Sequence, residues 1–187
     1  MNNFSSLTNH FLIAMPTLSD PNFYRSVTYV CEHNPEGAMG IVINHPLDIR
    51  LSEVLTQMEL ESDDPEILNK MVYLGGPVQT ERGFVIHRPV GSWETTLQVT
   101  DELGITTSKD IIIALAQGHG PKECLIALGY AGWGAGQLEE ELANNAWLSG
   151  PADINVILNT PVKNRWESAA ALVGIDINNI SNDIGHA

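Results

Sequence analysis

The sequence is poor in cysteine, in basic residues and in long apolar runs, and each shortage argues against a class of protein. Its two cysteines, Cys31 and Cys124, belong to no C-x-x-C pair, which excludes the common zinc and thioredoxin-like patterns. No apolar run approaches the roughly 20 residues that a membrane-spanning helix needs. The first basic residue is Arg25, so the N-terminal stretch lacks the charged start of a secretory signal. We therefore expect a cytoplasmic protein.

The shortage of basic residues bears on possible partners. Nine Lys and Arg stand against 23 Asp and Glu, which gives a net charge of −14. Nucleic-acid affinity depends chiefly on cations that neutralise phosphates, and the nine cations are spread singly along the chain. An anionic membrane surface is disfavoured for the same reason. We expect no direct nucleic-acid partner and no membrane partner.

What remains is typical of one globular domain. The chain has 187 residues, 43% of them hydrophobic and 17% charged, which argues against disorder. A domain of this size buries roughly 70% of the surface that its unfolded chain exposes. We predict a single domain spanning residues 1–187.

A glycine-rich stretch at residues 125–139 organises the chain. An apolar run ends in spaced glycines and passes into a polar, helix-favouring segment, which predicts a strand, a loop and a helix to about residue 147. A glycine-rich turn before a helix is typical of phosphate sites, but Glu139, Glu140 and Glu141 would face the phosphate here. The Lys-Ser/Thr pair that closes a P-loop is also absent. We interpret the turn as an architectural corner.

Hydrophobic periodicity and turn residues predict the other elements. Apolar or alternating runs favour strands at 10–15, 26–32, 38–44, 72–74, 83–88, 95–100 and 153–158, with a hairpin turn at 33–37. Helical spacing favours helices at 51–58, 110–117 and 161–173, a turn of helix at 65–69, an N-cap at Ser108 and a C-cap at Gly174. Hairpins followed by alternating strands and helices indicate an α+β fold with a mixed sheet.

Five blocks in order along the chain resemble the AlgH family of bacterial proteins, also called the YqgE family. They are residues 15–26, 31–34, 40–46, 74–78 and 129–139, the last followed by Asn145-Ala146-Trp147. The resemblance covers nearly the whole chain and departs from the family pattern at His45 and Ala135. It implies a compact single domain whose mixed, largely antiparallel sheet bends strongly towards a partial barrel, flanked by about four helices. The family name comes from a proposed role in regulating alginate synthesis, and no catalytic or ligand residues carry over.

One pair of residues is a candidate for nucleophilic catalysis. In an extended strand Cys31 and His33 share a face with Tyr29, with Cα atoms of the pair roughly 6.5 to 7 Å apart. A reactive thiol needs a lowered pKa and solvent access, and a buried hydrophobic Cys31 is the favoured alternative. The six histidines form no H-x-H, H-x-x-H or H-E-x-x-H pattern, so we predict no metal site and no cofactor.

The glycine-bearing blocks suggest where a ligand could bind, because glycines in extended segments often mark a close approach of backbones. We predict a binding cleft between the sheet and its loops, formed by Arg25, Cys31, Asn44, Gly75, Gly76 and Trp133. Arg25 either clamps a carboxylate or pairs with Asp20 to brace its loop, and the brace is favoured. Trp133 is either a stacking platform or a buried plug, and the plug is favoured.

The leading functional hypothesis is an AlgH-like regulatory or interaction protein that binds a protein partner or a small ligand without catalysis. One alternative is a hydrolase or transferase of unknown substrate, with Cys31 or Ser26 as nucleophile and His33 as base. Another is a transcriptional regulator that binds DNA directly, which the net charge of −14 disfavours. The identity of the partner and the oligomeric state stay open.

Overall fold

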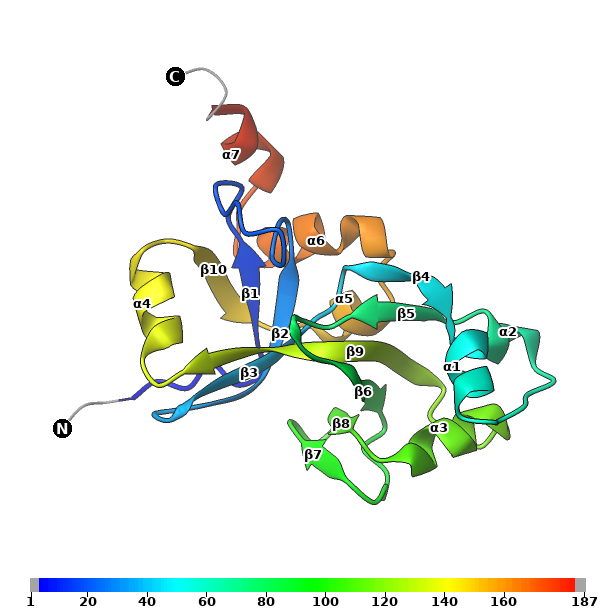
Figure 1. Ribbon diagram of the computed structural model, residues 1–187. Helices are drawn as coiled ribbons and strands as arrows, with labels where there is room; N and C mark the ends of the chain where they lie inside the picture. Colours follow the sequence, from blue (N-terminus) through cyan, green and yellow to red (C-terminus); the bar gives the residue numbers. More distant parts are fainter. Residues whose placement is uncertain (1–3, 184–187) are drawn as a thin grey trace.

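The computed structural model describes residues 4–183, which form ten strands, seven α-helices and one 3-10 helix, η1 (Figure 1). The strands are β1 (His10–Ala14), β2 (Val27–Asn34), β3 (Gly37–Val42), β4 (Pro46–Arg50), β5 (Met71–Leu74), β6 (Val78–Arg88), β7 (Thr96–Gln98), β8 (Gly104–Thr106), β9 (Glu123–Gly134) and β10 (Trp147–Pro151). The helices are α1 (Leu51–Gln57), α2 (Pro65–Leu68), α3 (Lys109–Ala116), α4 (Gln137–Ala143), α5 (Ile154–Leu158), η1 (Val162–Asn164), α6 (Arg165–Leu172) and α7 (Ile177–Asp183).

All ten strands join one sheet, which confirms the predicted α+β fold. The main order is β10-β1-β2-β3-β9-β6-β8-β7, with β5 paired to β9 and β4 paired to β5. Among the pairings of the described strands, only that of β5 with β9 is parallel. The sheet curls into a half-barrel, as the family resemblance implied. Helices number seven over residues 4–183 rather than about four, because several are only one or two turns long.

Strand β9 links the two halves of the sheet. Its first half pairs with β5 and β6, and its last four residues, 131–134, pair with β3. The two halves meet near Gly129, whose φ is 77°. A Cβ at Gly129 would lie 2.5 Å from the carbonyl oxygen of Gly76, so only glycine fits at this junction. Figure 1 shows β9 running across the middle of the molecule.

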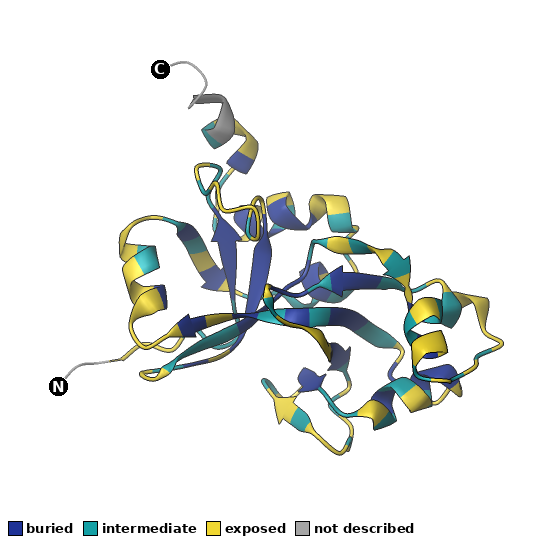
Figure 2. Cartoon of the chain, viewed as in Figure 1, coloured by how far each residue is buried: buried dark blue, intermediate teal, exposed yellow. Residues whose placement is uncertain are grey.

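The core is divided into three clusters by the curl of the sheet. The largest is centred on Tyr29, Ile41 and Phe84 and is covered by α5, α6 and α7. A second lies beneath α1 and α3, and a third lies beneath α4 around Trp133 and Trp147. The buried strands and half-exposed helices of Figure 2 follow this division. Helices α1, α3, α4, α5 and α6 therefore each cover part of the sheet, whereas α7 packs against α6.

The structure corrects the prediction for the C-terminal third. Residues 153–158 were predicted as a strand, but they form the short helix α5, because Asp153 caps its first turn by accepting a hydrogen bond from the Asn155 amide at 2.7 Å. Short apolar runs do not distinguish a buried strand from a buried helix. The edge strand is β10, which begins at Trp147, and α4 ends four residues earlier because Asn145 has a left-handed φ of 58°.

Other elements match or extend the predictions. Helices α1 and α3 lie where the apolar spacing placed them, and α6 ends at Gly174, whose φ of 76° suits the predicted cap. Ser108 precedes α3, although its hydroxyl donates to the Asp110 carboxylate at 2.5 Å instead of capping a backbone amide. Strands β4 and β8 were not predicted, and β7 is shorter and more exposed than the alternation of residues 95–100 indicated.

Two adjacent glycines bring strands into close contact, as predicted. A Cβ at Gly76 would lie 2.1 Å from the carbonyl carbon of Tyr130, and a Cβ at Gly75 would lie 2.3 Å from the carbonyl oxygen of Gly129. The Gly75 amide donates to Leu128 at 2.8 Å, and its carbonyl accepts from Val42 at 2.8 Å. These glycines therefore join β3, β5 and β9 and are part of the fold.

We expect Gly76→Ala to lower the free energy of unfolding by about 2 kcal/mol or more, since backbone atoms of Tyr130 would have to move to admit the methyl group. Urea unfolding at neutral pH measures this loss. Gly132→Ala is the matched control, because its Cβ would meet only the Tyr130 ring at 3.4 Å. Equal stability of both variants would contradict the packing role of Gly76.

Candidate functional site

Two depressions of the surface contain sequence-predicted residues. The first holds Arg25 and Asn44 and has a volume of about 410 Å³. Arg25 ends the loop before β2 with a left-handed φ of 52°, and its guanidinium lies 5.1 Å from the centre of the Trp166 ring. The Asn44 side chain accepts from Val27 at 2.8 Å and donates to the Arg25 carbonyl at 2.9 Å. Asn44 thus fastens the loop to the sheet through both the oxygen and the nitrogen of its side-chain amide.

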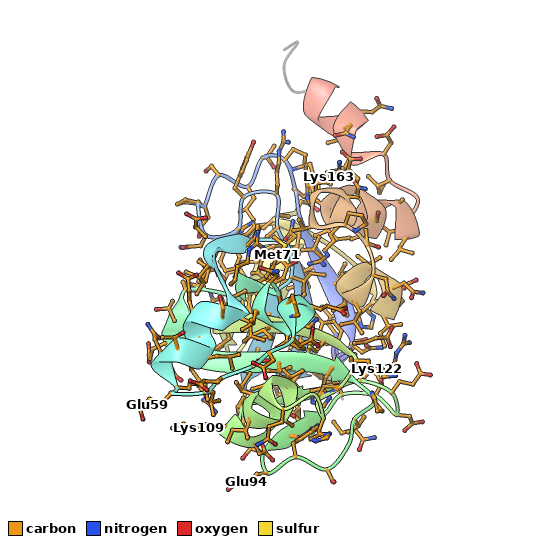
Figure 3. All side chains as sticks on the ribbon, turned by 90° about the vertical axis from the view of Figure 1, so that its right-hand side faces the viewer. Glu59, Met71, Glu94, Lys109, Lys122 and Lys163 are labelled. Atoms are coloured by element: carbon orange, nitrogen blue, oxygen red, sulfur yellow. The ribbon has the colours of Figure 1, made fainter. Side chains whose placement is uncertain are left out.

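The predicted brace between Arg25 and Asp20 is wrong. The Asp20 carboxylate accepts from the Asn22 amide at 2.9 Å, and the two ion pairs found over residues 4–183 do not include Arg25. Stacking on Trp166 and Tyr24 positions the guanidinium instead. Lys163, which Figure 3 shows beside α6, and His45 also line this cavity, and burial lowers the pKa of His45.

The second depression is larger, at about 750 Å³, and we call it the inner groove. It lies between the β2–β3 hairpin and the β7–β8 hairpin, across β6 and β9. It is lined by buried or half-buried Met39, Phe84, Ile105 and Tyr130, by exposed Glu32, Glu36, Arg82 and Leu97, and by Val78, Gly132 and Trp133 among others. Phe84 and Tyr130 meet edge to face at 5.7 Å, and Arg82 lies 5.3 Å from the Phe84 ring centre. An apolar base with a charged border is typical of a binding surface.

Trp133 is a buried plug, as the sequence favoured. It is 6% exposed and packs against Phe23 at 6.2 Å and Trp147 at 6.2 Å between ring centres. Only its margin reaches the inner groove. A stacking role would need an accessible ring face, which this packing does not provide.

The remaining predicted site residues lie elsewhere. Gly75 and Gly76 are buried in the strand contacts described above, and Cys31 is 2% exposed in the largest core cluster. Strand β2 has one extra residue opposite β3 at this point, a bulge that disturbs the simple alternation of residues 29–33. The predicted cleft is therefore divided: Arg25 and Asn44 share one cavity, Trp133 borders another, and Cys31 lines neither.

The geometry of Cys31 and His33 does not suit nucleophilic catalysis. The Cys31 thiol lies 3.5 Å from the Tyr29 carbonyl, and its burial, with a smaller contribution from Glu32, raises its pKa far above the ordinary value. His33 accepts a hydrogen bond at Nδ1 from the Leu7 amide at 2.9 Å, so its proton is on Nε2, which donates to Glu139 at 2.6 Å. Both ring nitrogens of His33, the proposed base, are therefore engaged in hydrogen bonds.

The Glu139–His33 contact explains the acidic start of α4. Desolvation raises the pKa of Glu139, but hydrogen bonds from its own amide and from His33 outweigh this, and the net effect is a lowered pKa. Glu141 instead accepts from the Trp147 indole at 3.3 Å. The corner is thus joined to β2 by one carboxylate and to β10 by another, which is an architectural use of these residues.

A buried polar chain on the other half of the sheet was missed by sequence reasoning. His87 is fully buried; its Nδ1 donates to Pro89 at 2.8 Å, and its Nε2 accepts from Thr106 at 2.7 Å. Thr106 in turn lies 2.7 Å from the Thr96 hydroxyl. Burial lowers the pKa of His87, which keeps the ring neutral. The chain ties β6, β7 and β8 together beside the inner groove, and only the pairing of these strands reveals it.

Comparison with known proteins agrees with the fold and the blocks. The family model described as AlgH-like matches residues 11–178. The chain belongs to the AlgH-like family. A UPF0301 protein from Nitrosococcus oceani is 60% identical over 179 residues, 96% of each chain, and one from Thioalkalivibrio sulfidiphilus is 56% identical over 98% of each chain.

Solved structures extend the comparison. The solution structure of the AlgH protein from Pseudomonas aeruginosa is 47% identical, covers 100% of both chains and superposes with a TM-score of 0.80. A crystal structure of a Corynebacterium diphtheriae protein has a TM-score of 0.72 at 17% identity, which shows a shared fold. The resemblance noted from the sequence is confirmed.

Within residues 4–183, no group of three or more His, Cys, Asp or Glu side chains is arranged to hold a metal ion. None of the helices in that range is long and apolar enough to cross a bilayer.

We expect iodoacetamide to label Cys31 in the native protein far more slowly than in the urea-unfolded chain, because the thiol is buried and its pKa is raised. Peptide mapping by mass spectrometry separates Cys31 from Cys124. Native labelling of Cys31 at the unfolded rate would restore the catalytic alternative.

We expect Glu139→Gln to destabilise the protein at pH 7 and to destabilise it less at pH 3.5. A carboxylate with a lowered pKa in the folded state contributes stability above its unfolded pKa, near 4.3, and this is lost as pH falls through the folded value. Thermal unfolding at both pH values measures the difference. An equal loss at the two pH values would mean that the charge of Glu139 does not matter.

Proposed function

We propose that the AlgH-like chain is an interaction protein, and that it binds a polypeptide segment of a partner protein in the inner groove. The observation that carries this proposal is the groove itself, about 750 Å³ with Met39, Phe84 and Tyr130 among its lining residues. Phe84 is held in place by its neighbours, so the groove is formed before any partner arrives. A preformed apolar surface reduces the ordering cost of binding.

Charge favours a basic partner segment. The chain carries a net charge of −14, and Glu32 and Glu36 lie exposed in the hairpin that borders the groove. Figure 3 labels both acidic and basic side chains at the outer margin of the molecule, Glu59, Glu94 and Lys109 among them. The surplus of 23 Asp and Glu over nine Lys and Arg makes the surface acidic on balance. Lysine and arginine flanking apolar residues would complement such a surface and speed association. The same charge argues against nucleic acid and anionic membranes as partners.

Binding without catalysis is the action that these residues support. Cys31 is buried, both nitrogens of His33 are engaged, and neither side chain lines the groove. A regulatory role in the cytoplasm, exerted through the bound partner, is part of the proposal. Binding of a small anionic ligand is a second candidate, favoured by the juxtaposition of Arg25 and Lys163 in the smaller cavity of an otherwise acidic chain.

Site-specific photo-cross-linking tests the groove. A benzoyl-phenylalanine is placed at Leu97, which lines the groove, or at Ile113, which lies outside it; the two are 39% and 38% exposed. We expect a cross-link to a partner at position 97 and not at position 113. The cross-linked segment, made as a synthetic peptide, should bind the wild-type protein and lose at least about tenfold in affinity for Tyr130→Ala.

The control for Tyr130→Ala is its melting temperature, which must stay far above the temperature of the binding assay. The same cross-linked species at both positions, or a peptide whose affinity is unchanged by the loss of the Tyr130 ring, would contradict the proposal.

A further inference from the structure

The last four residues of β9 have an unpaired side that faces the inner groove. Residues 131–134 pair with β3 on one side. On the other side β6 accompanies β9 only as far as Tyr130, opposite Val78. No other strand of the described residues 4–183 pairs with this side of residues 131–134. The backbone here therefore forms a short sheet edge, and Gly132 and Trp133 of this edge line the inner groove.

One hydrogen bond shows which backbone groups point to this edge. The Gly134 amide donates to the side chain of Gln137 at 3.0 Å, so it does not point at β3. In an antiparallel pair the backbone groups of alternate residues point to the same side. The amide and carbonyl of Gly132 consequently point to the unpaired edge as well.

The two glycines on this edge are not needed by the protein's own packing. A Cβ at Gly40 or Gly76 would clash with neighbouring atoms at 2.6 Å or less, but at Gly132 it would meet only the Tyr130 ring at 3.4 Å, and at Gly134 only Gln137 at 3.9 Å. Neither has a positive φ that would demand glycine. Glycine weakens a strand and is often found where a second backbone approaches. Over residues 4–183, no backbone atom outside the flanking residues lies within 4 Å of a Cβ at either position.

We propose that an extended segment of a basic protein partner adds to β9 as a new strand along the edge at residues 131–134. This deepens the function proposed above and rests on it. Main-chain hydrogen bonds to Gly132 and Gly134 would hold the segment, and its alternate apolar side chains would enter the groove beside Tyr130 and Met39. Four strand residues span roughly 13 Å, which sets a segment of about four to six residues.

Charge selects the occupant. A second copy of this chain would bring a further net charge of −14 to a groove whose border has two glutamates, Glu32 and Glu36, and one arginine, Arg82, so self-association is disfavoured. A segment with lysines between apolar residues is attracted instead. The Gly134 amide donates a hydrogen bond to the Gln137 side chain. This hydrogen bond must break before the amide can pair with the partner segment.

The test uses an acetylated and amidated hexapeptide of alternating lysine and valine as the probe, with the full-length protein at 150 mM salt. Isothermal titration should give a dissociation constant below about 1 mM, since main-chain pairing tolerates many sequences. Two analogues carry N-methyl groups on the valines or on the lysines, which removes the amides of one edge of the peptide. One analogue should lose at least about tenfold in affinity and the other should not, because only one edge faces β9.

Variants of the protein complete the test. Gly132→Val should weaken probe binding at least about tenfold at an unchanged melting temperature, since its side chain fills space beside Tyr130. Gly83→Val is the matched control, a glycine with open space around it on β6 outside the groove, and should leave binding unchanged. Gln137→Ala should strengthen binding by freeing the Gly134 amide.

The outcomes separate this inference from the proposed function. If both N-methylated analogues bind as tightly as the parent peptide, or if the parent does not bind, strand addition is overturned. A groove-specific cross-link at position 97 would then still support a partner that binds without pairing. If the cross-link is absent and the probe does not bind, both proposals fail.

Discussion

The close approach of the Gly75–Gly76 backbone to β9 is the contact on which the rest of the structure depends. The backbone of these two glycines lies against the backbone of Gly129 and Tyr130 in β9. Any side chain at Gly75 or Gly76 would clash with those backbone atoms. Through this contact β5 joins β9 in parallel while the Gly75 carbonyl reaches β3. The curl of the sheet, the division of the core and the position of the groove all follow from this junction.

The corner after β9 shows how acidic residues can be structural. A glycine-rich turn before a helix offers free amides, and in many proteins these bind an anion. Here the Gln137 side chain accepts a hydrogen bond from the Gly134 amide, and the Glu139 carboxylate accepts one from His33, so the chain supplies its own acceptors. The helix that follows has only seven residues, and its main contribution is to cover Trp133 and Trp147 through Leu138.

The surroundings of the glycines divide them into two groups. Some are required by the packing of the fold, and others are not. Gly40, Gly75, Gly76 and Gly129 each face atoms that exclude a side chain. Gly132 and Gly134 face the inner groove or solvent, where a side chain would fit. All six lie in blocks that the sequence alone marks as glycine-bearing. Only the atoms around each glycine show whether it is required for packing or leaves an open surface.

The sequence by itself determined the α+β class, the family, the burial of Trp133, and the strand and helix around the glycine corner. It also determined α1, α3 and α6. These features could be predicted because periodicity, caps and ordered blocks are local signals. It could not determine α5, since a short apolar run fits a strand or a helix until Asp153 is seen to cap it. Nor could it show that Arg25 and Trp133 border different cavities, or that His87 meets Thr106, because strand pairing creates these contacts between distant residues. The tertiary structure decided the site, because a groove exists only once the sheet has curled.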